Sequence, residues 1–391
     1  MPRIAYISST FPDYKKCGTG IYASYICQAL AQQGHDVHVV TSAIPEIRPT
    51  FGKVTVHKIM ESWNPLDLPK LVQLFQRIRP EVIHINHPTA IAAQKSKILI
   101  NMLPDANRAF WKLPLLTTLH EFIHVTLMGK AKLFPLIYSS DLLTVTNQRS
   151  HEAVCKILPA PQQAKVRVVN IGSMLNESRL SENLSKNQRR EAREKWGLVA
   201  DDKVVGFVGF LTPPKGFHNL VTALAPLLRK NPKIKVLALS SWNMSSPVYR
   251  KKILDQIEFE KISGQVIFSG YLEDDGVWES LPAIDLCVFP FDEPVEDRSS
   301  GPLRQALFRG IPTVVYADDL GYSEFGFKHG ENIWFTPMTN TNSLRTDVEK
   351  LLNDDLLRSK IADGTSDLRV QFSNDTVSNS FSRLYAEMLA K

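Results

Sequence analysis

The sequence is poor in cysteine and has no long apolar run, and these absences exclude whole classes of protein. Its four cysteines are widely separated and form no C-x-x-C pair, which indicates reduced thiols and not a disulfide framework: Cys17, Cys27, Cys155 and Cys287. No stretch approaches the ~20 apolar residues that a membrane-spanning helix needs. Residues 4–7 are strand-like and lack the layout of a signal peptide. We therefore expect a cytoplasmic protein.

The composition is typical of a folded protein with two domains. Hydrophobic residues make up 43% and charged residues 22% of the 391 residues, which argues against disorder, and the length exceeds what one hydrophobic core usually organises. Residues 1–175 carry 19 Lys and Arg against 10 Asp and Glu. This basic half favours an anionic partner or a membrane surface. Neither a helix-turn-helix nor an aromatic-plus-basic pattern suggests a nucleic acid.

Short β-branched runs alternate with helical patterns twice along the chain, separated by a polar stretch at residues 176–195. We expect strands at 4–8, 37–41, 54–59, 82–85, 115–119, 142–145 and 166–169, then at 204–208, 236–239, 266–269, 286–289, 313–316 and 333–335. Helices fit at 21–33, 219–230, 303–309 and 374–391. This rhythm predicts an α/β protein with two Rossmann-like, doubly wound domains facing a cleft. We expect them at 1–175 and 176–373, with the helix at 374–391 packing back towards the first.

Two turns before helices are candidates for binding a phosphorylated ligand. Gly18 and Gly20 precede the first helix, where glycine lets the backbone approach a ligand and the helix N-terminus favours an anion. Lys215, followed by Gly216, precedes the helix at 219–230 and is placed to neutralise a pyrophosphate. Each motif alone also fits a tight turn or a solvated lysine. The first lacks the third glycine of the dinucleotide fingerprint, which argues against NAD.

A third turn, Ser299-Ser300-Gly301, opens the helix at residues 303–309. Small residues there would leave backbone N–H groups for an anion, although ordinary helix capping explains the same sequence. Its place at a later helix of the second series, where a cleft is expected, favours binding.

Together these motifs resemble the family 4 glycosyltransferases of the GT-B fold over nearly the whole chain. The matching runs are Gly18-Thr19-Gly20, GHDV at 34–37, RPEVIH at 79–84, TTLHE at 117–121, Lys215-Gly216, Gly270-Tyr271-Leu272, AIDL at 283–286 and GEN at 330–332. The resemblance implies transfer of a sugar from a nucleotide-sugar donor with retention of configuration, without metal or cofactor. The implied acceptor is a glycan, a lipid-linked glycan or a small molecule.

The resemblance also implies roles for individual residues. Lys215 and the amides around Ser300 and Gly301 would stabilise the departing nucleoside diphosphate. His120 would contact the donor sugar, and Asp297 would hold the sugar hydroxyls. The remaining donor contacts are expected from Gly18, Gly20, Tyr271, Leu272, Ser299, Leu303 and Gln305.

The sequence departs from the family pattern at the donor site. An arginine usually precedes the lysine, and Phe210 stands in its place, with Arg298 or Arg304 as a conjectured replacement. The family's paired glutamates fall on Asp297 and Gln305. Gln305 can form a hydrogen bond but lacks the charge that strengthens it. A non-catalytic protein that binds nucleotide sugars or glycans is therefore the alternative class.

A zinc-protease pattern, H-E-x-x-H, also occurs at residues 120–124. Thr118 and Glu121 would form a capping box, so that one helix could present His120 and His124 on one face. No downstream ligand stands at a recognisable spacing, and the segment follows a strand inside an α/β domain, so we expect no metal there.

Cations and large apolar residues are mixed at residues 95–112, which include Lys95, Lys97, Arg108, Phe110, Trp111 and Lys112. This mixture suits a surface resting on anionic lipid head groups. A core helix with a solvated basic face explains it equally well. The first interpretation predicts a peripheral contact with the inner face of the membrane.

Overall fold

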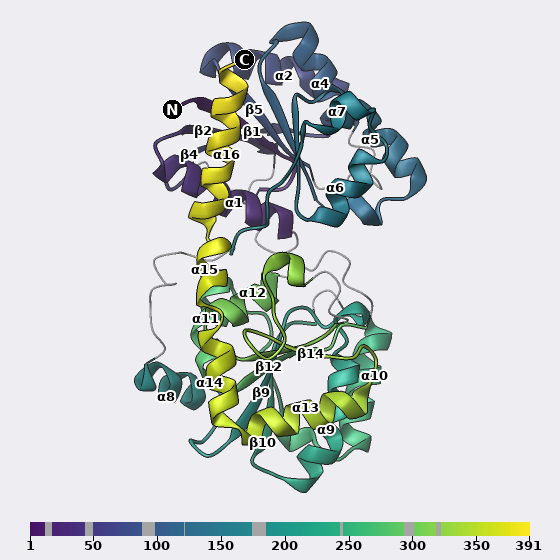
Figure 1. Ribbon diagram of the computed structural model, residues 1–391, viewed down its shortest axis with the longest axis vertical. Coiled ribbons are helices and arrows are strands. Elements are labelled where there is room, and N and C mark those ends of the chain that lie inside the picture. Colours follow the sequence, from purple (N-terminus) through teal and green to yellow (C-terminus); the bar gives the residue numbers. More distant parts are fainter. Residues whose placement is uncertain are drawn as a thin grey trace. The chain divides into compact units, whose positions relative to one another are not determined.

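The chain folds into two compact units, each built on its own sheet (Figure 1). The computed structural model describes residues 1–11, 18–43, 50–87, 98–120, 122–173, 185–242, 245–292, 301–317 and 322–391. Unit 1 comprises Met1–Met174 and Gln371–Lys391, and unit 2 comprises Leu175–Val370. Unit 1 is therefore assembled from both ends of the chain.

Unit 1 contains an eight-stranded sheet in the order β3-β4-β2-β1-β5-β6-β7-β8. The strands are β1 (Arg3–Ser8), β2 (Asp36–Ser42), β3 (Thr50–Phe51), β4 (Val54–Met60), β5 (Val82–His87), β6 (Leu115–Leu119), β7 (Leu142–Val145) and β8 (Val166–Val168). Only β3 is antiparallel to its neighbour. The order reverses between β1 and β5, so the carboxyl ends of these two strands flank the point where such sheets bind ligands.

Helices cover both faces of this sheet. They are α1 (Gly18–Gln32), α2 (Leu68–Ile78), α4 (Ile98–Phe110), α5 (Leu127–Ser139), α6 (Gln148–Cys155), α7 (Ala160–Gln163) and α16 (Asn374–Leu389). Alternate side chains of a strand point to opposite faces. Ile4 and Tyr6 accordingly pack in a core with α1 and α16, whereas Ala5 and Ile7 pack in a second core with α2, α4 and α5.

The last helix, α16, is joined to unit 1 by polar contacts as well as by its apolar face. Tyr385 Oη lies 2.6 Å from His84 Nδ1, and Thr118 Oγ1 lies 2.7 Å from the other ring nitrogen. Burial lowers the pKa of His84 to about 3, so the ring is neutral and offers one donor and one acceptor. Towards the helix start, His35 Nε2 lies 2.8 Å from Ser382 Oγ.

Unit 2 contains a six-stranded sheet in the order β11-β10-β9-β12-β13-β14. Its strands are β9 (Lys203–Val208), β10 (Ile234–Leu239), β11 (Val266–Phe268), β12 (Leu286–Phe289), β13 (Thr313–Tyr316) and β14 (Trp334–Thr336). These strands pair in parallel throughout the sheet, and the order reverses between β9 and β12. The helices are α8 (Lys186–Lys195), α9 (Phe217–Lys230), α10 (Pro247–Phe259), α11 (Asp274–Ser280), α12 (Gly301–Phe308), α13 (Thr341–Asn353), α14 (Asp355–Asp363) and α15 (Ser366–Gln371).

The predicted α/β class with two doubly wound sheets is confirmed, and every predicted strand is present within a few residues of its expected bounds. Two details differ. The two-residue strand β3 was not expected, and α1 begins at Gly18 and not at residue 21. Within the described residues, we find no helix with the length and apolarity required to cross a bilayer.

Replacing Tyr385 with Phe should destabilise unit 1. The substitution removes a hydroxyl and leaves a nitrogen of the fully buried His84 without its partner, which costs about 1–3 kcal/mol. Urea unfolding followed by tryptophan fluorescence measures the loss. Tyr138→Phe is the control because that side chain is 41% exposed. Equal stability of the two variants would contradict the anchoring role of Tyr385.

Candidate functional site

In unit 1, predicted site residues gather where β1, β5 and β6 end. His120 follows β6, and its Nε2 lies 2.7 Å from Oδ1 of Asn86 near the end of β5. The Asn86 amide nitrogen donates to the Thr19 carbonyl at 3.2 Å and to Ser8 Oγ at 3.2 Å. Because a carbonyl only accepts, the amide is oriented with its oxygen towards the imidazole. His120 therefore carries its proton on Nε2.

The protonation state of His120 follows from its surroundings. Burial and, to a smaller extent, the neighbouring His87 together lower its pKa to about 3. The ring is thus neutral at physiological pH, with a lone pair on Nδ1 that can accept a hydrogen bond from a hydroxyl. Tyr22 packs against it edge-on, with ring centroids 5.0 Å apart. A neutral imidazole in this position can bind a polar ligand through a hydrogen bond, but it has no positive charge with which to bind an anion.

Gly18 and Gly20 lie in the first turn of α1 and not in a loop before it. A Cβ atom at Gly20 would lie 3.2 Å from the Thr10 carbonyl, so glycine allows this turn to pack against the chain that follows β1. Gly18 is exposed, and a Cβ there would meet no atom within 4 Å. Gly18 therefore leaves backbone accessible at the helix N-terminus.

The H-E-x-x-H segment does not form the helix that the zinc pattern requires. Thr118 lies in β6, where it bonds to His84, and a short 3-10 helix at Phe122–His124 follows. The proposed capping box at Thr118 is therefore wrong, and Glu121 lies outside the described residues. Over the ranges that the structure describes, three or more His, Cys, Asp or Glu side chains nowhere converge on a metal-sized site.

In unit 2, Lys215 lies on the loop after β9, at the point where the strand order reverses. It ends a 3-10 helix at Pro213–Lys215, and Gly216 follows with φ +71°. A Cβ at Gly216 would lie 1.6 Å from the Pro290 carbonyl, beyond the end of β12. Asp292 N donates to the Pro214 carbonyl at 3.1 Å. The lysine loop is thus fastened to the chain after β12 by backbone contacts.

The surroundings of Lys215 include residues that the sequence analysis missed. Its Nζ lies 5.2 Å from the centre of the Phe291 ring. Asp292 Oδ1 accepts a 3.1 Å hydrogen bond from Asn219, and Oδ2 lies 3.4 Å from His218 Nε2. In the sequence, only their positions could have identified these residues. The segments after β9 and after β12 both follow strands that end at the same edge of the sheet. Phe210, in the place of the family arginine, is 37% exposed.

Helix α12 begins close to the end of β9. A Cβ built on Gly209 would lie 3.7 Å from Cγ of Pro302, next to Gly301. Leu303 and Arg304 are each 1% exposed, and Gln305 is partly buried. Four other residues of this motif lie outside the described residues: Asp297, Arg298, Ser299 and Ser300.

Tyr271 and Leu272 also lie on this edge, following β11, which pairs with β10. Tyr271 is exposed, and a Cβ built on Gly276 of α11 would lie 3.4 Å from Cδ2 of Leu272. The predicted site residues that the structure describes therefore form two sets. One set, in unit 1, contains Gly18, Gly20 and His120, and the other, in unit 2, contains Lys215, Tyr271, Leu272, Gly301, Leu303 and Gln305.

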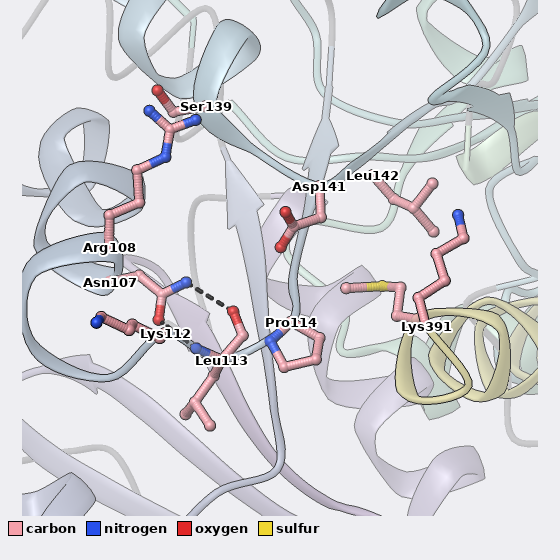
Figure 2. A pocket seen from close by; sticks show the side chains of 10 residues that line it. Asn107, Arg108, Lys112, Leu113, Pro114, Ser139, Asp141, Leu142 and Lys391 are labelled. Carbon is pink, nitrogen blue, oxygen red and sulfur yellow. Dashed lines mark hydrogen bonds between the residues drawn. The ribbon is translucent and has the colours of Figure 1, made fainter.

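Unit 1 also has a pocket of ≈ 500 Å³ at the opposite edge of its sheet (Figure 2). Pro114 precedes β6 and Leu142 begins β7, so the pocket lies where these strands start. Arg108, Lys112 and Lys391 line it together with one carboxylate, Asp141. None of the predicted site residues contributes to it.

Comparisons with known proteins cover nearly the whole chain. The model described as "Glycosyltransferase Family 4" matches residues 17–172, and "Glycosyl transferases group 1" matches residues 188–366. N-acetyl-alpha-D-glucosaminyl L-malate synthase of Bacillus anthracis is 22% identical over 95% of this chain and 94% of that protein. The capsular polysaccharide biosynthesis glycosyltransferase CapM of Staphylococcus aureus is 20% identical over 92% of each. Anabaena HepE, solved with UDP-glucose, has a TM-score of 0.74 at 18% identity and covers 99% of this chain and 100% of its own.

Replacing Gly216 with Ala should displace the lysine loop and destabilise unit 2. The left-handed backbone alone costs a non-glycine residue about 1–2 kcal/mol, and the added methyl group would overlap the Pro290 carbonyl. Thermal unfolding measures the effect. Gly264→Ala is the matched control, because a Cβ there meets no atom within 4 Å. If both variants unfold at the same temperature, the close approach to Pro290 is not present in solution.

Proposed function

Because the chain belongs to the family 4 glycosyltransferases, which have the GT-B fold, we propose that it transfers a sugar from a nucleotide-sugar donor with retention of configuration and without a metal ion. The supporting observation is the position of Lys215. Its loop lies between the ends of β9 and β12, where a doubly wound sheet binds phosphorylated ligands. Unit 2 would thus hold the donor.

In the proposed reaction, the bond between the anomeric carbon and the diphosphate breaks, and the diphosphate leaves with both electrons. The acceptor oxygen forms its bond on the same face of the sugar, and its proton passes to an oxygen of the departing diphosphate. Negative charge develops on the departing diphosphate, and Lys215 would neutralise it as a preorganised cation. The backbone N–H groups at the start of α12, near Gly301, would assist. A cation built into the protein would do the work that other transferases assign to a divalent ion.

The remaining residues would position the donor and acceptor. His120 is neutral with a lone pair on Nδ1, so it would accept a hydrogen bond from a sugar hydroxyl. Gly18 would let the backbone of unit 1 approach the ligand. Asp297 would hold further sugar hydroxyls and Gln305 the ribose. Tyr271 and Leu272 would flank the base.

The names of the relatives guide the choice of donor and acceptor to test. HepE was solved with UDP-glucose, and the Bacillus relative is named for an N-acetylglucosaminyl group joined to L-malate. CapM is named for capsular polysaccharide biosynthesis. The donor panel should therefore begin with UDP-glucose and UDP-N-acetylglucosamine, and the acceptor panel should include glycans, lipid-linked glycans and small hydroxy acids. We further propose a cytoplasmic location with a peripheral membrane contact.

The direct test measures donor binding and then transfer. A bound donor raises the unfolding temperature by mass action, so a thermal shift selects the nucleotide sugar. Transfer or hydrolysis of that donor is then followed, and the anomeric configuration of the product is read from its proton NMR coupling. An inverted product would refute retention. Binding with no turnover on any acceptor, including water, would instead support the non-catalytic alternative.

Lys215→Ala should weaken binding of a nucleoside diphosphate about ten- to hundredfold, because one charge-assisted contact is lost. Transfer should fall at least as far, since the lysine acts on charge that grows as the bond breaks. Calorimetry with UDP and an initial-rate assay measure the two effects. Lys230→Ala is the matched control at the far end of α9, and it should retain both properties. Unchanged binding by Lys215→Ala would show that the donor lies elsewhere.

Removing metal ions should leave transfer intact. Purified protein treated with EDTA should keep its rate, and added Mg²⁺ or Mn²⁺ should not raise it, because Lys215 would supply the charge. Elemental analysis should detect no stoichiometric zinc. A rate that disappears with EDTA and returns with one specific divalent ion would refute metal independence.

A further inference from the structure

Helix α5 is apolar on two faces, and only one of them is covered. Leu133, Leu136 and Ile137 are fully buried in the core beneath α5. On the outside, exposed residues recur at spacings of four, three and four: Leu127, Ala131, Phe134 and Tyr138. These spacings place them along one stripe of a helix.

The apolar side chains of the outer stripe are more exposed to solvent than is usual on a surface helix. Leu127 is 87% exposed, and Phe134 and Tyr138, whose rings stack with centroids 5.5 Å apart, are 46% and 41% exposed. Met128 beside them is 72% exposed. A surface helix usually presents polar groups outward, and contiguous exposed apolar side chains indicate an interaction surface.

The neighbouring helix α4 extends this surface. It packs against α5, and both helices follow parallel strands and so run in the same direction along the sheet. Leu99, Ile100 and Leu103 of α4 are buried, as expected for a core helix, but Ile98, Met102 and Phe110 are exposed. Lys95 and Lys97, which precede α4, lie outside the described residues.

The charges on this surface are almost all positive. Residues 98–112 and 127–139 contain Arg108, Lys112, Lys130 and Lys132 against a single acid, Asp105. Two of these cations, Arg108 and Lys112, also line the pocket shown in Figure 2, at the C-terminal ends of both helices, where Lys391 adds a third. An apolar stripe flanked by lysine and arginine is the pattern of a helix that lies in the surface of an anionic membrane.

We propose that α4 and α5 form a docking surface for an anionic lipid bilayer, with the stripe Leu127–Ala131–Phe134–Tyr138 at its centre. The apolar side chains enter the boundary between head groups and acyl chains, while Lys130 and Lys132 extend to the phosphates. This inference rests on the proposed peripheral location and assigns a surface to it.

A second copy of this chain fits the same surface less well than a bilayer does. In a twofold dimer, each helix meets its own symmetry mate, so Lys130 and Lys132 would face the same cations across the interface. Within residues 98–112 and 127–139 Asp105 is the only carboxylate that could face them, and Asp141 lies beyond the end of α5, in the pocket. A layer of lipid phosphates supplies the opposite charge along the whole length of the helix.

The position of α5 connects this surface to the acceptor. The helix starts at Leu127, soon after His120 at the end of β6, so its first turn lies towards the carboxyl edge of the sheet where the unit 1 site residues gather. A bilayer under α5 would present an acceptor along that edge. The surface therefore favours a lipid-linked acceptor over a freely diffusing one.

The test is sedimentation of the full-length protein with vesicles of phosphatidylcholine, with and without phosphatidylglycerol. Leu127→Ser/Phe134→Ser should bind anionic vesicles at least about tenfold more weakly than the unchanged protein, because buried apolar area is lost. Lys130→Glu/Lys132→Glu should bind about thirtyfold more weakly. High salt should reduce binding of the unchanged protein, since the attraction between cations and phosphates is screened.

Helix α10 of unit 2 provides matched controls. Val248 and Phe259 are 80% and 83% exposed, and Lys251 and Lys252 lie between them, but Asp255 interrupts this face. Val248→Ser/Phe259→Ser and Lys251→Glu/Lys252→Glu should bind vesicles as the unchanged protein does. Binding lost through these variants and not through the α5 variants would overturn the proposal.

Two further measurements separate the alternatives. If the α5 variants alter the mass measured by light scattering and leave vesicle sedimentation unchanged, the stripe is a protein interface and the proposal is wrong. The absence of any vesicle binding at low salt would also refute it. Binding of UDP to the α5 variants should stay unchanged, so that a failure of the glycosyltransferase proposal remains distinguishable from a failure of membrane docking.

Discussion

Parallel strand pairing is the constraint on which both units depend. A parallel strand can be followed by its neighbour only after the chain has crossed back over the sheet, so each helix covers a face and each loop after a strand emerges at the same edge. This brings His120, Asn86 and Ser8 together in unit 1, although they are far apart in sequence. In unit 2 it brings the Lys215 loop to the chain after β12.

The same constraint explains why so much of the fold could be predicted from the sequence. Strands buried on both faces appear as short β-branched runs, such as residues 37–41 and 204–208, and helices of suitable length separate them. The prediction failed where local signals were weak or misleading. Strand β3 has only two residues and no such pattern. Gly18 and Gly20 suggested a loop because glycine is a poor helix former, yet Gly20 is needed so that the helix can pack against Thr10.

The candidate site could be predicted only in part, for a similar reason. Lys215 was found because a lysine before a helix is a local pattern. Asn86 was not, because its role depends on a contact with His120 across the sheet that only the strand order reveals. The zinc interpretation of the H-E-x-x-H match was not adopted from the sequence, and the capping box that it required is absent because Thr118 is part of β6. The roles of Asp297, Ser299 and Ser300 remain predictions, as they lie outside the described residues.

The discontinuous make-up of unit 1 has a consequence for how the protein is made. Phe381 and Tyr385 of α16 complete the core that contains Ile4 and Tyr6, and α16 follows unit 2 in the chain, so it leaves the ribosome after unit 2. Unit 2 is one continuous stretch, so it can fold while the chain is still being synthesised. Synthesis of unit 1 therefore starts before that of unit 2 and is completed after it. All eight strands of its sheet precede unit 2, but the core that faces α16 stays open until unit 2 has been synthesised. During that interval its apolar side chains are exposed to aggregation and to chaperones.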